Sequence, residues 1–300
     1  MTLAATADLV TSAVSAGTAV LAFNVVTIEH AEAIADGAER AGISALLQIS
    51  ENTVGFHGSR IAPLAKACAQ IATHSTAPLA VHLDHFQDIA LIAEAIEMAA
   101  DLGVSSIMID AAALAYQDNL DRTRAFTDDA HAAGLWVEAE LGEVGGKAGD
   151  TRGAHAPGVR TDPQEAAAFA ESTGVDALAV AVGSTHAMTT RDADLDHALI
   201  AKLAAAVSIP LVLHGSSGVP ADALRRAVDT GIRKVNIGTA LNLAYTSAVR
   251  ESLTADPAAT DPRTYLAAAR KAVADTVVDV GRAIAAPEPI RADAGMSESR

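Results

Sequence analysis

The stretch LAVHLDHFQDIALIAEAIEMAADLGVSSIMI, residues 79–109, decides the fold. It begins with a short β-rich apolar run over residues 79–83, continues with an amphipathic, alanine-rich run over 88–102 and ends with a second β-rich run over 105–109. The outer runs suit strands, whereas the middle run has the length and periodicity of a helix. A strand, a helix and a strand in this order predict one βαβ unit with parallel strands.

The same alternation extends in both directions along the chain. We expect strands over residues 19–25, 45–49, 79–83, 105–109, 135–141, 177–182, 210–213 and 234–237. We expect helices over residues 28–41, 59–74, 88–102, 119–133, 163–173, 194–207, 220–230 and 241–253. Several of these helices end at a glycine, which is a common helix stop signal. These glycines are Gly42, Gly134, Gly174 and Gly231.

Eight strands that alternate with eight helices predict an α/β fold, and in about 250 residues the (β/α)8 TIM barrel fits best. A run over residues 263–284 adds an extra C-terminal helix. The alternative is a doubly wound open sheet, which is weakened because no GxGxxG turn follows the first strand. We predict one TIM-barrel domain over residues 1–286 and a polar, flexible tail over 287–300.

The composition limits the classes of partner. Of 300 residues, 21 are Lys or Arg and 37 are Asp or Glu, which gives a net charge of −16. Nucleic acids and anionic membranes attract positive charge, so we expect neither as a partner. The single cysteine, Cys68, rules out an internal disulfide framework and suits the cytoplasm. No basic segment opens the chain and no apolar run reaches the ~20 residues of a membrane helix, so we expect no signal peptide and no membrane span.

Barrels of this kind carry their function at the carboxyl ends of the strands. Three histidines, His85, His186 and His214, stand at the ends of three different predicted strands. Imidazoles that converge from separate strands suit Zn²⁺, which takes nitrogen ligands and keeps one position open in catalytic sites. An isolated core or loop histidine is the ordinary explanation of any one alone, but three at equivalent ends favour a metal centre.

Acidic residues accompany two of these strand ends. Asp84 precedes His85 and either moves a proton on metal-bound substrate or, as the alternative, orients a histidine. Glu138 and Glu140 share a parity on the fifth strand, so both point into the barrel if one does. We expect Glu140, nearer the mouth, to be an alternate metal ligand and Glu138 to be structural.

Small and hydroxyl-bearing residues follow the last three strands. Loops with backbone N–H groups at helix N-termini bind anions, and the loops after strands seven and eight are a frequent phosphate site in barrels. Ordinary turns are also rich in glycine and serine. The position of these loops after the last strands, rather than their composition, therefore favours a phosphate site. The candidate phosphate residues are Gly183, Gly215, Ser216, Ser217, Asn236, Gly238 and Thr239.

Taken in order, these residues form a series of motifs. They are AFNV at 22–25, HLDH at 82–85, VEAELG at 137–142 followed by GG at 145–146, TGVD at 173–176, VGSTH at 182–186, LHGSSG at 213–218 and KVNI at 234–237. Together they resemble the class II, zinc-dependent ketose-bisphosphate aldolases, which include fructose- and tagatose-bisphosphate aldolases. The resemblance runs from about residue 8 to about residue 284.

The resemblance implies an aldehyde-lyase of carbohydrate metabolism, which reversibly cleaves a phosphorylated ketose to dihydroxyacetone phosphate and an aldehyde. It implies one Zn²⁺ per chain on His85, His186 and His214, with Glu140 as an alternate ligand. It implies that Asp84 protonates the nascent aldehyde oxygen. The substrate and phosphate residues that it implies are Asn24, Gly183, Gly215, Ser216, Ser217, Asn236, Gly238 and Thr239. It further implies a homodimer or homotetramer and a monovalent cation, Na⁺ or K⁺, near the phosphate.

One departure from the family concerns the proton-transferring base. After its two glycines the family continues x-Glu-Asp, whereas this chain reads GGKAGD at 145–150 and has Ala148 in place of that glutamate. The irregular segment 142–161, which contains six glycines, offers substitutes. We hypothesise that Asp150 or His155 supplies the base and that Arg160 or Arg191 meets an anionic group. The alternative is a mobile surface lid whose side chains are solvated.

Three functions follow from these features. The first is a metal-dependent aldolase, whose substrate is a fructose or tagatose bisphosphate or a non-glycolytic deoxy-, sulfo- or monophosphate ketose. The second is a metal-dependent hydrolase, which commonly carries an HxH pair on its first strand, where this chain has Phe23-Asn24-Val25. The third is a sugar-phosphate sensor that lost its base at Ala148, against which Asp84 and the three histidines argue.

Overall fold

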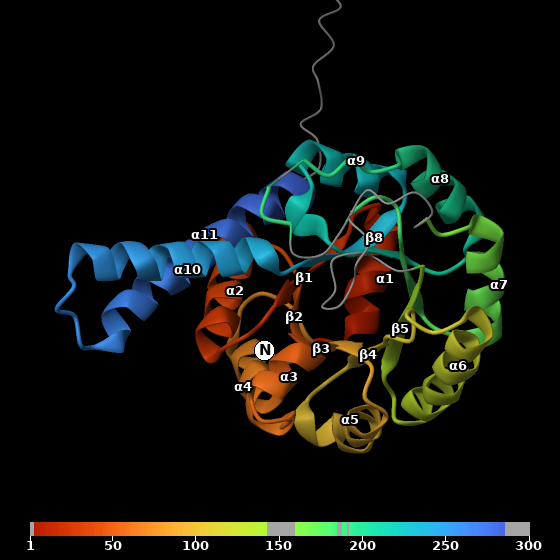
Figure 1. The fold of residues 1–300 in the computed structure, drawn as a ribbon, viewed down its shortest axis with the longest axis horizontal. Coiled ribbons are helices and arrows are strands. Elements are labelled where there is room, and N and C mark those ends of the chain that lie inside the picture. The colour runs from red at the N-terminus through yellow and green to blue at the C-terminus, as the bar shows by residue number, and fades with distance from the viewer. Residues whose placement is uncertain (1–2, 143–159, 185–187, 191, 286–300) are drawn as a thin grey trace, which may run out of the picture.

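Eight parallel strands close into a barrel in chain order, with the last strand beside the first (Figure 1). The computed structural model describes residues 3–142, 160–184, 188–190 and 192–285. The strands are β1 (Val20–Asn24), β2 (Ala45–Ser50), β3 (Leu79–Phe86), β4 (Ser106–Ile109), β5 (Trp136–Leu141), β6 (Ala177–Val180), β7 (Leu211–Leu213) and β8 (Ile232–Ile237). The closed ring confirms the predicted TIM barrel and excludes the open doubly wound sheet.

Helices surround the ring of strands (Figure 1). They are α1 (Thr6–Ala16), α2 (Ile28–Ala41), α3 (Glu51–Phe56), α4 (Ala62–His74), α5 (Ile89–Leu102), α6 (Tyr116–Ala132), α7 (Pro163–Thr173), α8 (His197–Ala206), the 3₁₀ turn η1 (Ser216–Gly218), α9 (Ala221–Thr230), α10 (Thr239–Ala255) and α11 (Pro262–Ala285). The predicted bounds of α2 and α7 are confirmed to the residue, and α11 confirms the extra C-terminal helix. The sequence pattern did not predict α1 or α3.

Helix α1 closes the bottom of the barrel. Its apolar side chains Leu9, Val10 and Ala13 belong to one buried cluster with inward-facing residues of the strands, among them Leu46 and Trp136. A second, larger cluster fills the space between the strands and the outer helices. Because apolar packing seals the lower half of the barrel, the inward polar residues gather in the upper half, at the carboxyl ends of the strands.

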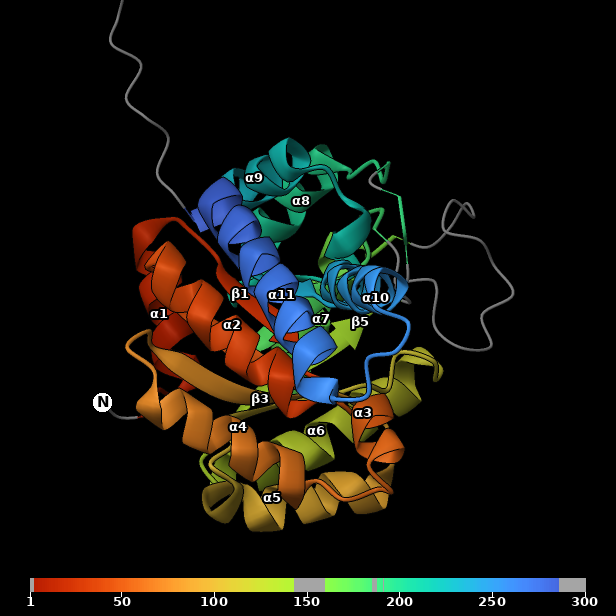
Figure 2. The same cartoon turned by 90° about the vertical axis from the view of Figure 1, so that its left-hand side faces the viewer.

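Helices α10 and α11 form a long hairpin that projects from one side of the barrel (Figures 1 and 2). Helix α11 lies beside α2 (Figure 2), and the two approach closely at Gly37, where an added side chain would collide with Val277. The predicted division into a domain over 1–286 and a tail over 287–300 stays a prediction, because residues 286–300 lie outside the described part of the chain.

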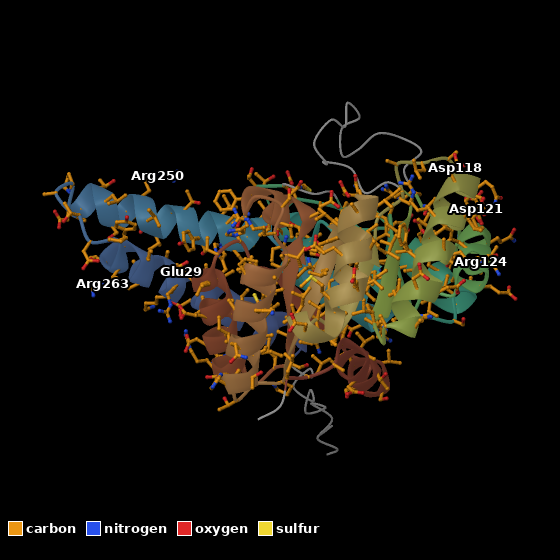
Figure 3. All side chains as sticks on the ribbon, turned by 90° about the horizontal axis from the view of Figure 1, so that it is seen from below. Glu29, Asp118, Asp121, Arg124, Arg250 and Arg263 are labelled. Atoms are coloured by element: carbon orange, nitrogen blue, oxygen red, sulfur yellow. The ribbon has the colours of Figure 1, made fainter. Side chains whose placement is uncertain are left out.

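Charged side chains lie on the outer helices, as Figure 3 shows for Asp118, Asp121 and Arg124 of α6 and for Arg250 of α10. The acidic surplus of the sequence is therefore compatible with an apolar barrel wall. Among the described residues, no helix combines the length and the apolar character that crossing a bilayer requires.

Candidate active site

The HLDH motif lies at the end of β3 on a bulge. Leu83 pairs with Ile107 of β4 and Phe86 pairs with Ile109, so Asp84 and His85 together face a single residue of β4. His85 has a φ of +53°, in the left-handed region that residues other than glycine rarely adopt. Backbone strain of this kind, about 1–3 kcal/mol, clusters at functional sites. The bulge lets consecutive residues, Asp84 and His85, both serve the mouth of the barrel.

Asp110, which follows β4, orients His85. The Nδ1 atom of His85 lies 2.9 Å from Oδ2 of Asp110, and Gln87 donates to the same oxygen at 3.0 Å. This contact fixes the imidazole plane and its tautomer, as a carboxylate does behind a metal-bound histidine. A carboxylate does orient a histidine here, but the sequence pattern assigned that alternative role to Asp84, whereas Asp110 makes the contact.

His214 follows β7 and is fully buried between two glutamates of β5. Its Nε2 atom lies 2.8 Å from Oε1 of Glu138, and its Nδ1 atom lies 3.4 Å from Oε2 of Glu140. Burial opposes protonation, but hydrogen bonds to Glu138 and Glu140 outweigh it and raise the pKa of His214 to about 9. The rings of His85 and His214 meet edge to face with their centroids 4.7 Å apart.

The described residues fit a metal ion. Ligand atoms of Asp84, His85 and His214 lie within 4.8 Å of one another, and so do those of His85, Asp110 and Glu140. Each imidazole also has one nitrogen on a carboxylate, Asp110 for His85 and Glu138 for His214. Two oriented imidazoles with carboxylates form a donor set that suits Zn²⁺. The third predicted ligand, His186, lies outside the described residues.

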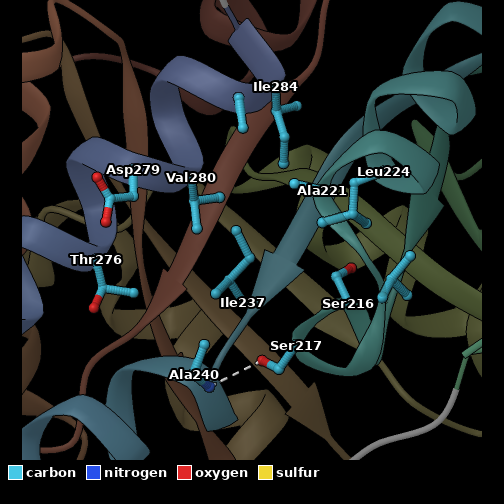
Figure 4. Close-up of a pocket in the computed structure, with 12 residues that line it drawn as sticks. Ser216, Ser217, Ala221, Leu224, Ile237, Ala240, Thr276, Asp279, Val280 and Ile284 are labelled. Carbon is cyan, nitrogen blue, oxygen red and sulfur yellow. Dashed lines mark hydrogen bonds between the residues drawn. The ribbon is translucent and has the colours of Figure 1, made fainter. Parts of the chain in front are cut away.

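The predicted phosphate residues come together beside this cluster. The Ser184 hydroxyl donates to the backbone oxygen of His214 at 2.6 Å, which ties the loop after β6 to the end of β7. The Ser217 hydroxyl accepts from the backbone N–H of Ala240 at 3.1 Å and so joins η1 to the first turn of α10 (Figure 4). Asn24 lies against Gly238, where an added side chain would come within 3.1 Å of its amide carbon. Predicted residues from β1, β7 and β8 thus lie close together.

Arg160 extends this group. Its Nη2 atom lies 3.3 Å from the position that a Cβ atom would take on Gly183, and such a Cβ would also collide with the backbone oxygen of Asp194. Gly183 has a φ of +121°, so both conformation and space require glycine. The arrangement brings a guanidinium to the predicted phosphate loop. The other candidates of the sequence analysis, Asp150, His155 and Arg191, lie outside the described residues.

A separate cavity of about 240 Å³ lies behind these loops, between β8, α9 and α11 (Figure 4). Ile237 lines it together with Leu224, Asp279 and two predicted phosphate residues, Ser216 and Ser217. Side chains alternate along a strand, so Ile237 points away from the interior that Asn236 faces. The cavity therefore lies outside the barrel wall and is distinct from the metal-ligating cluster.

Lys234 contributes to the site although the sequence pattern gave it no role there, and Asp110 stands at a predicted strand end to which the pattern gave no task. The Nζ atom of Lys234 is fully buried and lies 2.8 Å from Oε2 of Glu138. Burial raises the pKa of Glu138, but Lys234 and then His214 hold it well below its usual range. One signal was available: Lys234 shares the inward parity of Asn236, so a lysine was to be expected inside the barrel. Glu138, predicted to be structural, contacts His214 directly.

Comparisons with known proteins agree with this geometry. Residues 4–286 match the protein family described as class II fructose-bisphosphate aldolase. The chain belongs to the class II fructose-bisphosphate aldolase family. Among solved structures, the YdjI aldolase from Escherichia coli K12 is 30% identical, with a TM-score of 0.80 over 94% of this chain and 97% of that chain. A fructose-bisphosphate aldolase (Fba) from Campylobacter jejuni shares the fold at 22% identity, with a TM-score of 0.78 over 93% of each chain.

Membership of this family confirms the predicted enzyme class, a lyase of the class II aldolase type. Class II aldolases are generally metal-dependent, and the clusters around His85 provide a place for an ion. The family acts on phosphorylated sugars, which agrees with the gathering of phosphate-type loops beside those clusters.

Proposed function

We propose that this aldolase reversibly cleaves a phosphorylated ketose to dihydroxyacetone phosphate and an aldehyde. The observation that carries the proposal is the position of Asp84. Its carboxylate offers a ligand atom within 4.8 Å of those of His85 and His214. It also accepts a hydrogen bond from Gln48, which donates to Asn24 near the phosphate-type loops as well. A carboxylate in that place can accept a proton from a hydroxyl of a substrate held by both groups.

Each residue of the described site then has one task. We assign Zn²⁺, one per chain, to His85, His186 and His214, with Glu140 as an alternate ligand. Such an ion would polarise the ketone and stabilise negative charge as the C3–C4 bond breaks. In cleavage, Asp84 takes the proton of the C4 hydroxyl as this oxygen becomes the aldehyde oxygen, and in condensation it returns that proton. Asp110 and Glu138 hold the imidazoles of His85 and His214 in place.

The phosphate group belongs, in this proposal, to the loops after the last three strands. The backbone N–H groups of Gly183, Gly215 and Gly238 would bind the anion, and Arg160 adds a positive charge beside Gly183. The residues that complete this assignment are Asn24, Ser216, Ser217, Asn236 and Thr239. A monovalent cation, Na⁺ or K⁺, beside the phosphate is part of the same assignment.

The base at the dihydroxyacetone carbon is assigned to Asp150 or His155, because Ala148 stands at the position of the family's glutamate. Alanine variants of each residue test this assignment. Loss of cleavage in one of them identifies the base, and near-normal rates in both remove the idea.

Substrate choice is the finer part of the proposal. Fructose or tagatose 1,6-bisphosphate is the first candidate. A deoxy-, sulfo- or monophosphate ketose is the second, since the sequence after His186, AMTT at 187–190, lacks the lysine with which the family often meets phosphate. We further propose a cytoplasmic homodimer or homotetramer, for which the single buried cysteine, Cys68, supports the reducing compartment.

A panel of phosphorylated ketoses, with release of dihydroxyacetone phosphate as readout, tests the proposed function. Asp84→Asn is the matched control, because it keeps the shape of the side chain and removes the carboxylate that accepts the proton. We expect the wild-type protein to cleave at least one ketose phosphate and Asp84→Asn to lose about 100-fold or more of the rate. Ligand-induced stabilisation without cleavage of any ketose phosphate would instead indicate a sensor.

A further inference from the structure

A lysine lies inside the barrel, directly below the site. Lys234 of β8 is fully buried, and among the described residues its side chain is one of the largest without solvent contact. A buried ammonium is costly unless it is paired and all its hydrogens find acceptors. Its contacts therefore indicate what the protein gains from keeping a charge at this position.

Three side-chain oxygens surround the ammonium, one from an ion-pair partner and two from hydrogen-bond acceptors. The Nζ atom of Lys234 lies 2.8 Å from Oε2 of Glu138, 2.7 Å from Oδ1 of Asn236 and 3.4 Å from Oε1 of Gln48. An ammonium donates up to three hydrogen bonds and accepts none. Both amide side chains must therefore turn their carbonyl oxygens toward Lys234 and their NH₂ groups away from it.

Those NH₂ groups converge on Asp84. Gln48 donates through Nε2 to Oδ2 of Asp84 at 3.0 Å, and Asn236 donates through Nδ2 to Oδ1 at 3.4 Å. Each carboxylate oxygen thus receives one amide donor. If either amide turned over, its carbonyl oxygen would face a carboxylate oxygen, and the two would repel. Lys234 therefore determines which way Asp84 is held, although the two side chains do not touch.

A second set of contacts, the Glu138 branch, leads from Lys234 through Glu138 to His214. Glu138 receives Lys234 on Oε2 and contacts Nε2 of His214 through Oε1 at 2.8 Å. Lys234 therefore fixes one oxygen of Glu138, and the other oxygen fixes the imidazole of His214. One buried cation thus reaches both the carboxylate proposed to transfer the proton and a proposed metal ligand, each through intervening side chains.

We propose that Lys234 is a positioning residue of the reaction, which orients the amides of Gln48 and Asn236 toward Asp84 and steadies His214 through Glu138. The proposal rests on the roles of Asp84 and His214 assigned above. A purely structural lysine would only neutralise Glu138, and removing both charges together would then restore function.

The test compares Lys234→Met, Glu138→Gln and the double variant, with Lys202→Met on the exposed face of α8 as the matched control. Zinc affinity of the metal-free protein is measured by competition with a chelator. Steady-state cleavage of a ketose phosphate is then measured at saturating zinc, and thermal unfolding reports folding. Lys202→Met is expected to match the wild-type protein in all three.

We expect Lys234→Met to weaken zinc binding by about tenfold through the Glu138 branch. At saturating zinc we expect kcat to fall by about 100-fold or more, because Asp84 loses its orientation. We expect a smaller change in KM, because Lys234 also orients Asn236, which is assigned to the phosphate. The double variant regains thermal stability, because no buried charge is left unpaired, yet its kcat stays as low as that of Lys234→Met.

Recovery of kcat in the double variant above that of both single variants would overturn the proposal, and so would a kcat of Lys234→Met within threefold of wild type. If the wild-type protein cleaves no ketose phosphate, the proposed function fails separately. Zinc affinity then still decides the Glu138 branch: unchanged affinity in Lys234→Met overturns it and a tenfold loss supports it.

Discussion

Replacing Asp110 with alanine removes the carboxylate behind His85. In the folded protein, Oδ2 of Asp110 lies 2.9 Å from Nδ1 of His85 and also accepts from Gln87 at 3.0 Å. Without it, the imidazole loses the contact that fixes its plane and its tautomer. We therefore expect Asp110→Ala to weaken metal binding while the barrel itself persists.

The magnitude follows from two features of this strand end. Loss of a carboxylate behind a metal-bound histidine typically costs 10–100-fold in affinity, or about 1.4–2.7 kcal/mol. His85 also has a φ of +53°, which costs about 1–3 kcal/mol that neighbouring contacts must offset. Because Asp110 supplies two of those contacts, we expect an affinity loss near the upper end, about 100-fold.

Chelator competition on the metal-free protein measures this loss directly. The matched control is Asp275→Ala, because the Asp275 carboxylate accepts from Arg40 at 2.7 Å and from Lys271 at 2.6 Å on the outer helices, away from the cluster. The control should bind zinc like the wild-type protein. A zinc affinity of Asp110→Ala within threefold of wild type would refute the orienting role of Asp110.

Three further predictions follow from other buried groups. Burial lowers the pKa of His30 to about 4, so the free energy of unfolding should fall by up to about 3 kcal/mol as pH drops from 6.5 toward 4. Urea unfolding of His30→Phe should lack this part of the pH dependence. Burial raises the pKa of Cys68 to about 12, so a thiol reagent at pH 8 should label only the unfolded protein. Gly183→Ala should raise KM for the ketose phosphate at least tenfold, because its φ of +121° and the oxygen of Asp194 exclude a side chain.

The sequence predicts elements well where their ends carry local signals. Helix α2 ends where Gly42 adopts a φ of +66°, and α7 begins where Asp162 accepts from the backbone of Gln164 and Glu165. Helix α3 has six residues, too few to show a period, although Ser50 caps it. Strand β3 runs three residues beyond its predicted end at residue 83, because polar residues that look like a loop continue into the site.

The site is predictable to the extent that strand ends mark it. Asp84, His85, Glu140 and His214 converge as the barrel geometry requires. The contact between Asp110 and His85 depends on the bulge at the end of β3, which no local pattern indicates. Lys234 of β8 contacts residues of β2 and β5 as well as its own strand. Its role therefore emerges only from the closed barrel.

The most direct test of the account is metal-dependent aldol cleavage. The purified protein is stripped of metal with a chelator, reconstituted with one equivalent of Zn²⁺ per chain and assayed for dihydroxyacetone phosphate released from ketose phosphates. The account predicts no release by the stripped protein and full recovery with zinc. Release that survives chelation, or no release from any ketose phosphate by the zinc-loaded protein, would contradict it.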